Sequence, residues 1–254
     1  ADCLRRNVPV SEDMDVTTFL ADVGTISDWN IQGLPSDNLS TQNGILVTEC
    51  ARYPLLIDPQ GQAITWLMNK EAEKMPPTGA TQLNDNRLKD NVQFCMSEGK
   101  SLVVLGVEEE IDPMLDPVLE KRIIQKGRGR YINVADVMME YTPEFRLFFI
   151  TRLPNPMFSP ELQAKTTVID FTVTMKGLED QLLARVIGKE QSALEDQLNA
   201  VQRSVNENTK ALLALDAELL RRLTEGTGNL LDDDELVGVL ADTKAKAEEV
   251  TRKL

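Results

Sequence analysis

The chain has 254 residues, 42% of them apolar and 27% charged, and this composition is typical of a folded globular protein with one large or two smaller domains. A formal net charge of −14 disfavours nucleic-acid binding, which depends mostly on Lys and Arg, and no run approaches the roughly 20 apolar residues of a membrane span. The absence of His excludes Ser-His-Asp and Cys-His catalysis, and the three Cys show neither zinc spacing nor a disulfide framework, which suits a reducing compartment.

The first part of the chain alternates between helical and strand patterns. An N-terminal segment, 1–24, contains one short predicted helix, and a turn-rich stretch at 29–35 predicts an ordered loop. Short apolar runs occur at 45–47 and 55–57. The predicted helices cover 62–74, 85–98, 112–125 and 160–165. The predicted strands cover 101–107, 145–151 and 167–173, and a small hairpin covers 130–134 and 137–141.

This alternation predicts an α/β domain over residues 25–176, with a mainly parallel sheet covered by helices on both faces. The run 102–107 is apolar throughout, as expected for a strand buried on both faces. In open parallel sheets, ligands bind at the carboxyl ends of the strands. Candidate site residues are therefore sought at those ends.

Residues 177–254 show a different pattern, with apolar residues at heptad spacing. The predicted seam consists of Leu194, Leu198, Val201, Val205, Leu212, Leu215, Leu219, Leu236, Leu240, Ala247 and Val250. Because 226–229 interrupts it, the pattern favours a long antiparallel helical hairpin or coiled coil, with two helices of an ordinary small α-domain as the alternative. The chain begins without Met and stops at Leu254 inside the pattern, so we expect a fragment whose second helix is cut short.

The turn after 55–57 has the position of a phosphate-binding loop but not its composition. Such a loop needs several glycines, a Lys for the phosphates and a Ser or Thr for magnesium. Here Asp58, Gln60, Gly61 and Gln62 stand in its place, with no Lys before Lys70. A carboxylate at Asp58 would repel a nucleotide. We therefore expect a tight strand-to-helix turn that binds neither nucleotide nor metal.

Three further positions are candidates for site residues. Glu108 and Glu109 follow an apolar strand, as the carboxylates of a Walker B motif do, although the favoured alternative is a solvated loop, where Glu after a strand is also common. Asn155 follows the strand 145–151, where a sensor residue would lie. Lys165 stands between a short helix and the last strand, where a cation would reach a neighbouring subunit's nucleotide. The alternatives are a proline-stiffened loop at Asn155 and a solvated Lys165.

Several segments, in this order along the chain, together resemble the fifth AAA+ module of a dynein heavy chain. They are Trp29–Asp37, Asn43-Gly44, Arg52–Ala63, Glu110–Pro113, Lys121-Arg122, Tyr141–Arg146, Leu153–Pro156, Ser159–Gln163, Phe171–Thr174 and Gly177–Leu183. The resemblance implies an AAA+ (P-loop-NTPase-like) sheet followed by the strut, a helical hairpin that braces the microtubule-binding stalk. The sequences of 34–37 and 58–62 resemble those of axonemal dyneins more than those of cytoplasmic dyneins, and this resemblance implies a cilium or flagellum.

For function, the resemblance implies a module that binds no cofactor of its own and does not hydrolyse ATP, within a parent motor that uses ATP and magnesium. Its partners would be the neighbouring AAA+ modules and the stalk coiled coil, with microtubules contacted only through the parent chain and neither nucleic acid nor membrane bound. Lys165 falls where the family can place a basic finger, although Lys replaces Arg here. Two other hypotheses stay open, an ATPase that uses Glu108 and Glu109, and a coiled-coil oligomerisation scaffold.

Overall fold

The computed structural model describes residues 16–77, 79–108, 110–127 and 129–190. Within residues 191–254, which we call the arm, it describes 197, 200, 201, 203–205, 207, 208, 210–212, 214, 217, 220, 221, 224 and 244. Contacts divide the chain into two compact units: Ala1–Ala21 with Gln32–Gln181, and Asp22–Ile31 with Leu182–Leu254. Among the described helices, none combines the length and apolar character needed to cross a membrane.

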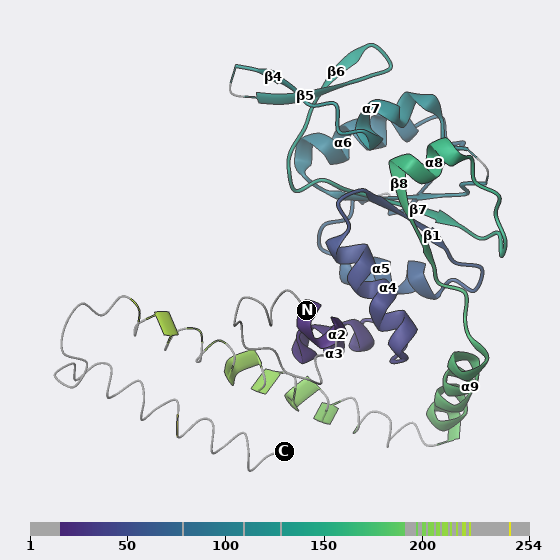
Figure 1. Ribbon diagram of the computed structural model, residues 1–254, viewed down its shortest axis with the longest axis vertical. Helices are drawn as coiled ribbons and strands as arrows, with labels where there is room; N and C mark the ends of the chain where they lie inside the picture. Colours follow the sequence, from purple (N-terminus) through teal and green to yellow (C-terminus); the bar gives the residue numbers. More distant parts are fainter. Residues whose placement is uncertain are drawn as a thin grey trace, which may run out of the picture. The chain divides into compact units, whose positions relative to one another are not determined.

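The first unit is built on a five-stranded parallel sheet (Figure 1). Its order is β2 (Thr81–Gln82), β3 (Ser101–Leu105), β7 (Arg146–Thr151), β1 (Tyr53–Ile57) and β8 (Thr166–Asp170). The three central strands, β3, β7 and β1, are almost entirely buried. Because all five strands are parallel, their carboxyl ends share one edge, and their amino ends share the other.

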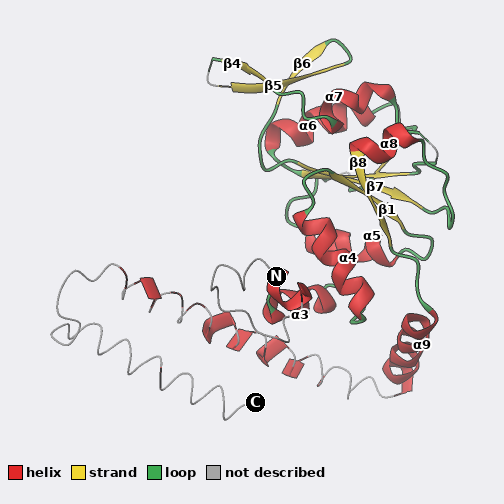
Figure 2. Cartoon of the chain, in the orientation of Figure 1, coloured by secondary structure: helices red, strands yellow, loops and turns green. Residues whose placement is uncertain are grey.

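Helices cover both faces of this sheet, as the sequence predicts (Figure 2). On one face lie α4 (Asn38–Glu49) and α5 (Gln62–Lys70), and on the other lie α6 (Leu88–Glu98), α7 (Asp116–Leu119) and α8 (Pro160–Lys165). The remaining helices of this part are α2 (Val16–Leu20), a 3₁₀ turn (Pro113–Leu115) and α9 (Met175–Glu190), which runs from the first unit into the second.

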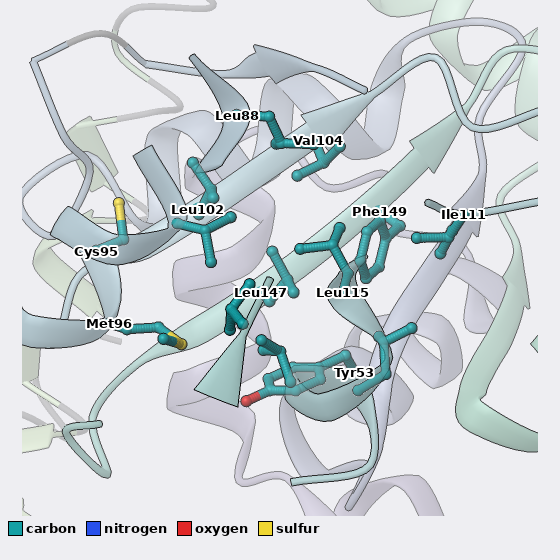
Figure 3. Packing of buried hydrophobic residues seen from close by; sticks show 14 of the residues in the cluster. Tyr53, Leu88, Cys95, Met96, Leu102, Val104, Ile111, Leu115, Leu147 and Phe149 are labelled. Atoms are coloured by element: carbon teal, nitrogen blue, oxygen red, sulfur yellow. The ribbon is translucent and has the colours of Figure 1, made fainter. Parts of the chain in front are cut away.

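Side-chain alternation along the strands produces a core on each face of the sheet. Leu102, Val104, Leu147 and Phe149 point to the face that α6 and α7 cover, in one cluster with Tyr53 (Figure 3). The intervening residues of the same strands point to the opposite face. They are buried as well, so the strands read as continuous apolar runs rather than as alternating ones.

A small antiparallel sheet lies between α7 and β7 in the chain, formed by β4 (Ile124–Lys126), β5 (Gly129–Val134) and β6 (Val137–Glu140). Its hairpin turn is Ala135-Asp136, with φ of 47° and 62°, which is the left-handed pair that a two-residue turn requires. The sequence predicted this hairpin. It missed β4, because three exposed residues carry no periodic signal.

The second unit contains α3 (Val23–Ile31) and the described arm residues, all of which are helical. Lys210 of the arm forms an ion pair with Asp28 of α3. Of the predicted seam, Val201 is 60% exposed, and Val205 and Leu212 are half-buried. The other eight seam residues and the predicted hairpin lie outside the described residues.

The apolar run 45–47 lies inside α4, which begins at Asn38 because Asp37 caps it by accepting from the Ser40 amide at 3.0 Å. Two local predictions were wrong. Residues 29–31 are the last turn of α3 rather than a loop. The predicted helix 112–125 is only a 3₁₀ turn and α7, after which Lys121 takes a left-handed φ of 51° that ends helical structure.

Candidate functional site

Asp58 follows β1 directly and closes the loop where a phosphate would bind in a nucleotide-binding relative of this fold. One carboxylate oxygen of Asp58 accepts from the backbone amides of Gly61 and Gln62 at 2.9 and 3.0 Å, and the other accepts from the Ile64 amide at 2.9 Å. Gly61 holds φ at 80°, a left-handed conformation that lets the chain turn into α5. The protein's own anion thus occupies the amino terminus of α5, which is otherwise a ready anion site.

The Asp58 carboxylate is completely buried, and this burial raises its pKa although the amides of Ile64, Gly61 and Gln62 oppose the shift. The backbone amide of Asp58 in turn donates to the Thr151 carbonyl at the end of β7. The loop is therefore held on both sides by the protein itself.

The two glutamines of the loop also form bonds within the chain. Gln62 donates to the carbonyl of Phe171 at 2.5 Å and accepts from the side chain of Gln181 in α9 at 2.8 Å. Gln60 accepts from the amide of Val173 at 3.3 Å. These contacts join the start of α5 and the turn before it to α9 and to the segment between β8 and α9.

The space that remains beside this loop is small. The cavity between α4, the Gln62 side chain, the segment 171–174 and α9 measures about 10 Å³. That is at most the room of a single water, for which roughly 10–15 Å³ of such space is needed. A nucleotide would have to displace both glutamine contacts and the Asp58 carboxylate.

Glu108 lies at the same edge of the sheet but in a separate groove. It is exposed after β3 and lines a groove of about 240 Å³ together with Arg152 and Leu153. The loop of Asp58 does not line this groove, nor does Asn155, which is exposed further along the chain. Glu109 lies outside the described residues. Among those described, no three Asp, Glu or Cys side chains gather as a metal site would require.

Lys165, at the end of α8, is held by carboxylates of its own chain. Its ammonium lies 2.8 Å from Asp116, 2.6 Å from Glu161 and 3.7 Å from Glu120, and its side chain is only 14% exposed. These contacts raise the pKa of Lys165 above its usual value. A role as a basic finger would require the ion pairs to open, and it stays a prediction.

The family model described as "ATP-binding dynein motor region" matches residues 27–250. The chain belongs to this dynein motor family. The parallel α/β sheet with helices on both faces is the architecture expected of an AAA+ domain in it.

Known dynein chains are similar over almost the whole of this sequence. It is 49% identical over 254 residues, or 100% of the chain, to the flagellar outer arm dynein gamma chain of Chlamydomonas reinhardtii. It is 45% identical over 98% of the chain to mouse dynein axonemal heavy chain 5, and 41% identical over 97% to the ciliary dynein beta chain of Heliocidaris crassispina. The chain spans 6%, 5% and 5% of these relatives' lengths, respectively.

Within this dynein region, the sequence singled out Asp58, Gln60, Gly61 and Gln62 as a loop, and it missed the residues that the structure places around them. Gln181 gave no signal because a single glutamine in a helix has no distinguishing pattern. Thr151 ends β7 as a polar residue that is 1% exposed, and it could have been found as the polar end of an otherwise apolar strand.

Proposed function

We propose that this chain is the fifth AAA+ module, non-hydrolysing, of an axonemal dynein heavy chain in a cilium or flagellum. In this role it relays ATP-driven movements of the motor ring to the microtubule-binding stalk. The family match and the names of the relatives, which are flagellar, axonemal and ciliary dyneins, support the parent protein. The neighbouring AAA+ modules and the stalk coiled coil are the partners that this role implies.

One observation carries the non-hydrolysing assignment. The carboxylate of Asp58 accepts the amides of Gly61, Gln62 and Ile64, the groups that would otherwise receive a phosphate. A second anion at the same amides would meet a buried carboxylate at contact distance, and like charges in such a place repel strongly. No Lys precedes Lys70 to offset that repulsion.

The relay role is supported by the path of α9. Its first turns belong to the α/β unit and are tied to the loop of Asp58 through the bond between Gln181 and Gln62. The same helix continues to Glu190 without a break and precedes residues 197–244 in the sequence. A rigid element of this kind transmits small rotations of a module, which is one of the established forms of conformational coupling.

The relay is tested in a full heavy chain that contains this module. Leu212→Pro would break the arm helix, at a cost of about 3 kcal/mol or more in a helix interior, and Leu212→Met, which keeps the side-chain volume, is the matched control. We expect the Pro variant to keep its basal ATPase activity but to lose the dependence of microtubule affinity on nucleotide. If that dependence survives in the Pro variant, the arm is not the relay.

A second candidate function is ATP binding and hydrolysis by the module itself. Two observations favour it: the family description includes "ATP-binding", and Glu108 is exposed at the carboxyl end of β3. An assay of phosphate release from Mg·ATP by this chain distinguishes the two candidates. Release above background that Glu108→Gln abolishes would replace the proposal by this alternative.

A further inference from the structure

A cavity of about 490 Å³ opens at the amino ends of β1 and β7, at the edge of the sheet opposite the loop of Asp58. Its wall is formed by the end of α4, the segment 49–54, the loops after α5 and α7, and residues 141–148. Tyr53, Tyr141 and Phe145 supply aromatic surface, packed edge to face. The volume is in the range of small-molecule sites, roughly 300–1,000 Å³.

The cavity is lined by more positive than negative charge, on a chain whose formal net charge is −14. Its four cations are Arg52, Lys74, Lys121 and Arg146, and its two carboxylates are Glu49 and Glu144. Within the part of the chain that the structure describes, none of the four cations forms a salt bridge. This differs from Lys165, which has three carboxylates around it.

The cations instead contact neutral groups. Lys121 donates to the Ala51 carbonyl at 2.7 Å and lies 5.1 Å from the centre of the Tyr53 ring, while Arg146 reaches the Thr48 carbonyl at 3.5 Å. These contacts orient the two side chains at the cavity wall and leave their remaining N–H donors for another acceptor.

Two neighbouring groups respond to the positive charge. The pKa of Lys70 is lowered to about 8, mainly by burial and in smaller part by the charges of Arg146 and Lys74, against the opposing effect of Glu71. Burial raises the pKa of the Cys50 thiol, whereas Arg146 and Lys121 act to lower it. Only the contributions of Arg146, Lys74 and Lys121 to these two shifts are those of a local positive potential, which an incoming anion would relieve.

We propose that this cavity binds a small polyanion that carries two or more phosphate or carboxylate groups. Two arginines on separate elements match oxyanions, because guanidinium donates to them in bidentate pairs. An extended peptide fits less well, since β1 and β7 are both paired on either side in the sheet and offer no free edge for strand addition. The ligand is therefore a compact one that enters the cavity itself.

The test is isothermal titration of the chain with pyrophosphate and, separately, with citrate, in magnesium-free buffer. Arg52→Gln with Arg146→Gln forms the test variant, and Arg130→Gln, an exposed residue of β5 outside the cavity, is the matched control. We expect saturable binding of at least one probe, weakened about 10-fold or more in the double variant and unchanged in the control. The preferred probe identifies phosphate or carboxylate as the ligand group.

The proposal is overturned if neither probe saturates at roughly 10 mM, which corresponds to less than about 3 kcal/mol of binding. It is also overturned if the double variant has an unchanged thermal melt and binds the probes as the wild type does. Hexaglutamate serves as an extended acidic peptide, and the proposal is overturned if it binds more tightly than both small probes. Asp58→Asn leaves the cavity intact, so binding here should be unchanged in that variant. This inference and the proposed function therefore fail independently.

Discussion

Asp58→Asn tests the bonding at the loop with almost no change in side-chain shape. In the wild type both carboxylate oxygens are used, one by the amides of Gly61 and Gln62 and the other by the amide of Ile64. Asparagine keeps a single acceptor oxygen, so its NH₂ group must face at least one backbone N–H. The residue that carries this N–H is half-buried, and the bond that the N–H donates to the carboxylate is lost.

The expected change in the free energy of unfolding combines two destabilising effects and one stabilising effect. An N–H that loses its partner beside a buried side chain costs up to about 1–3 kcal/mol, and the loss of a negative charge at a helix amino terminus costs about 0.3–1 kcal/mol. The gain is that the neutral amide avoids the burial cost that raises the pKa of Asp58. We therefore expect the free energy of unfolding to fall by about 2 kcal/mol.

Urea unfolding followed by circular dichroism at neutral pH measures this change. The control is Asp136→Asn in the β5–β6 turn, where the side chain is exposed and Asn tolerates the left-handed φ of 62° equally well. We expect the control to stay within about 0.5 kcal/mol of the wild type. If Asp58→Asn is no more destabilising than this control, the bonding described for the loop is wrong.

Three more substitutions test other parts of the first unit. Burial lowers the pKa of Lys70 from 10.5 to about 8, so the unfolded chain binds a proton that the folded chain lacks between these values. Unfolding free energy should therefore rise with pH across that window more steeply in the wild type than in Lys70→Met; equal slopes in urea titrations would contradict this. Ser101→Ala removes a buried 2.7 Å bond to Glu71 and should cost about 1–3 kcal/mol by the same assay, and a neutral result would show that Glu71 finds another partner. Ala135→Gly relieves a non-glycine φ of 47° and should raise the unfolding free energy by up to about 1 kcal/mol, whereas a loss would show that the turn is not strained.

The parallel sheet was predictable because its central strands are apolar throughout and separated by helical patterns. The run 101–107 and β3 agree closely, and α8 was predicted at its observed bounds, since Ser159 caps it and Pro160 begins it. The strand order was not predictable. β7 lies between β1 and β3, and no local pattern states which distant strands pair.

The candidate site was predictable in composition but not in bonding. The absence of a Lys and of further glycines in 58–63 is visible in the sequence. That Asp58 would bond to three amides of its own loop is a property of the backbone turn at Gly61, which only the structure shows. The cationic cavity gave no signal in the sequence, because its four cations come from separate segments between residues 52 and 146.

The central claim, that the loop of Asp58 excludes nucleotide, is tested most directly by photolabelling this chain with azido-ATP and magnesium and mapping the labelled peptides. The account predicts that residues 58–65 and 171–181 stay unlabelled at micromolar nucleotide, and that any labelling elsewhere is unchanged in Asp58→Asn. Saturable labelling of 58–65 at micromolar azido-ATP, removed by competing ATP, would contradict it.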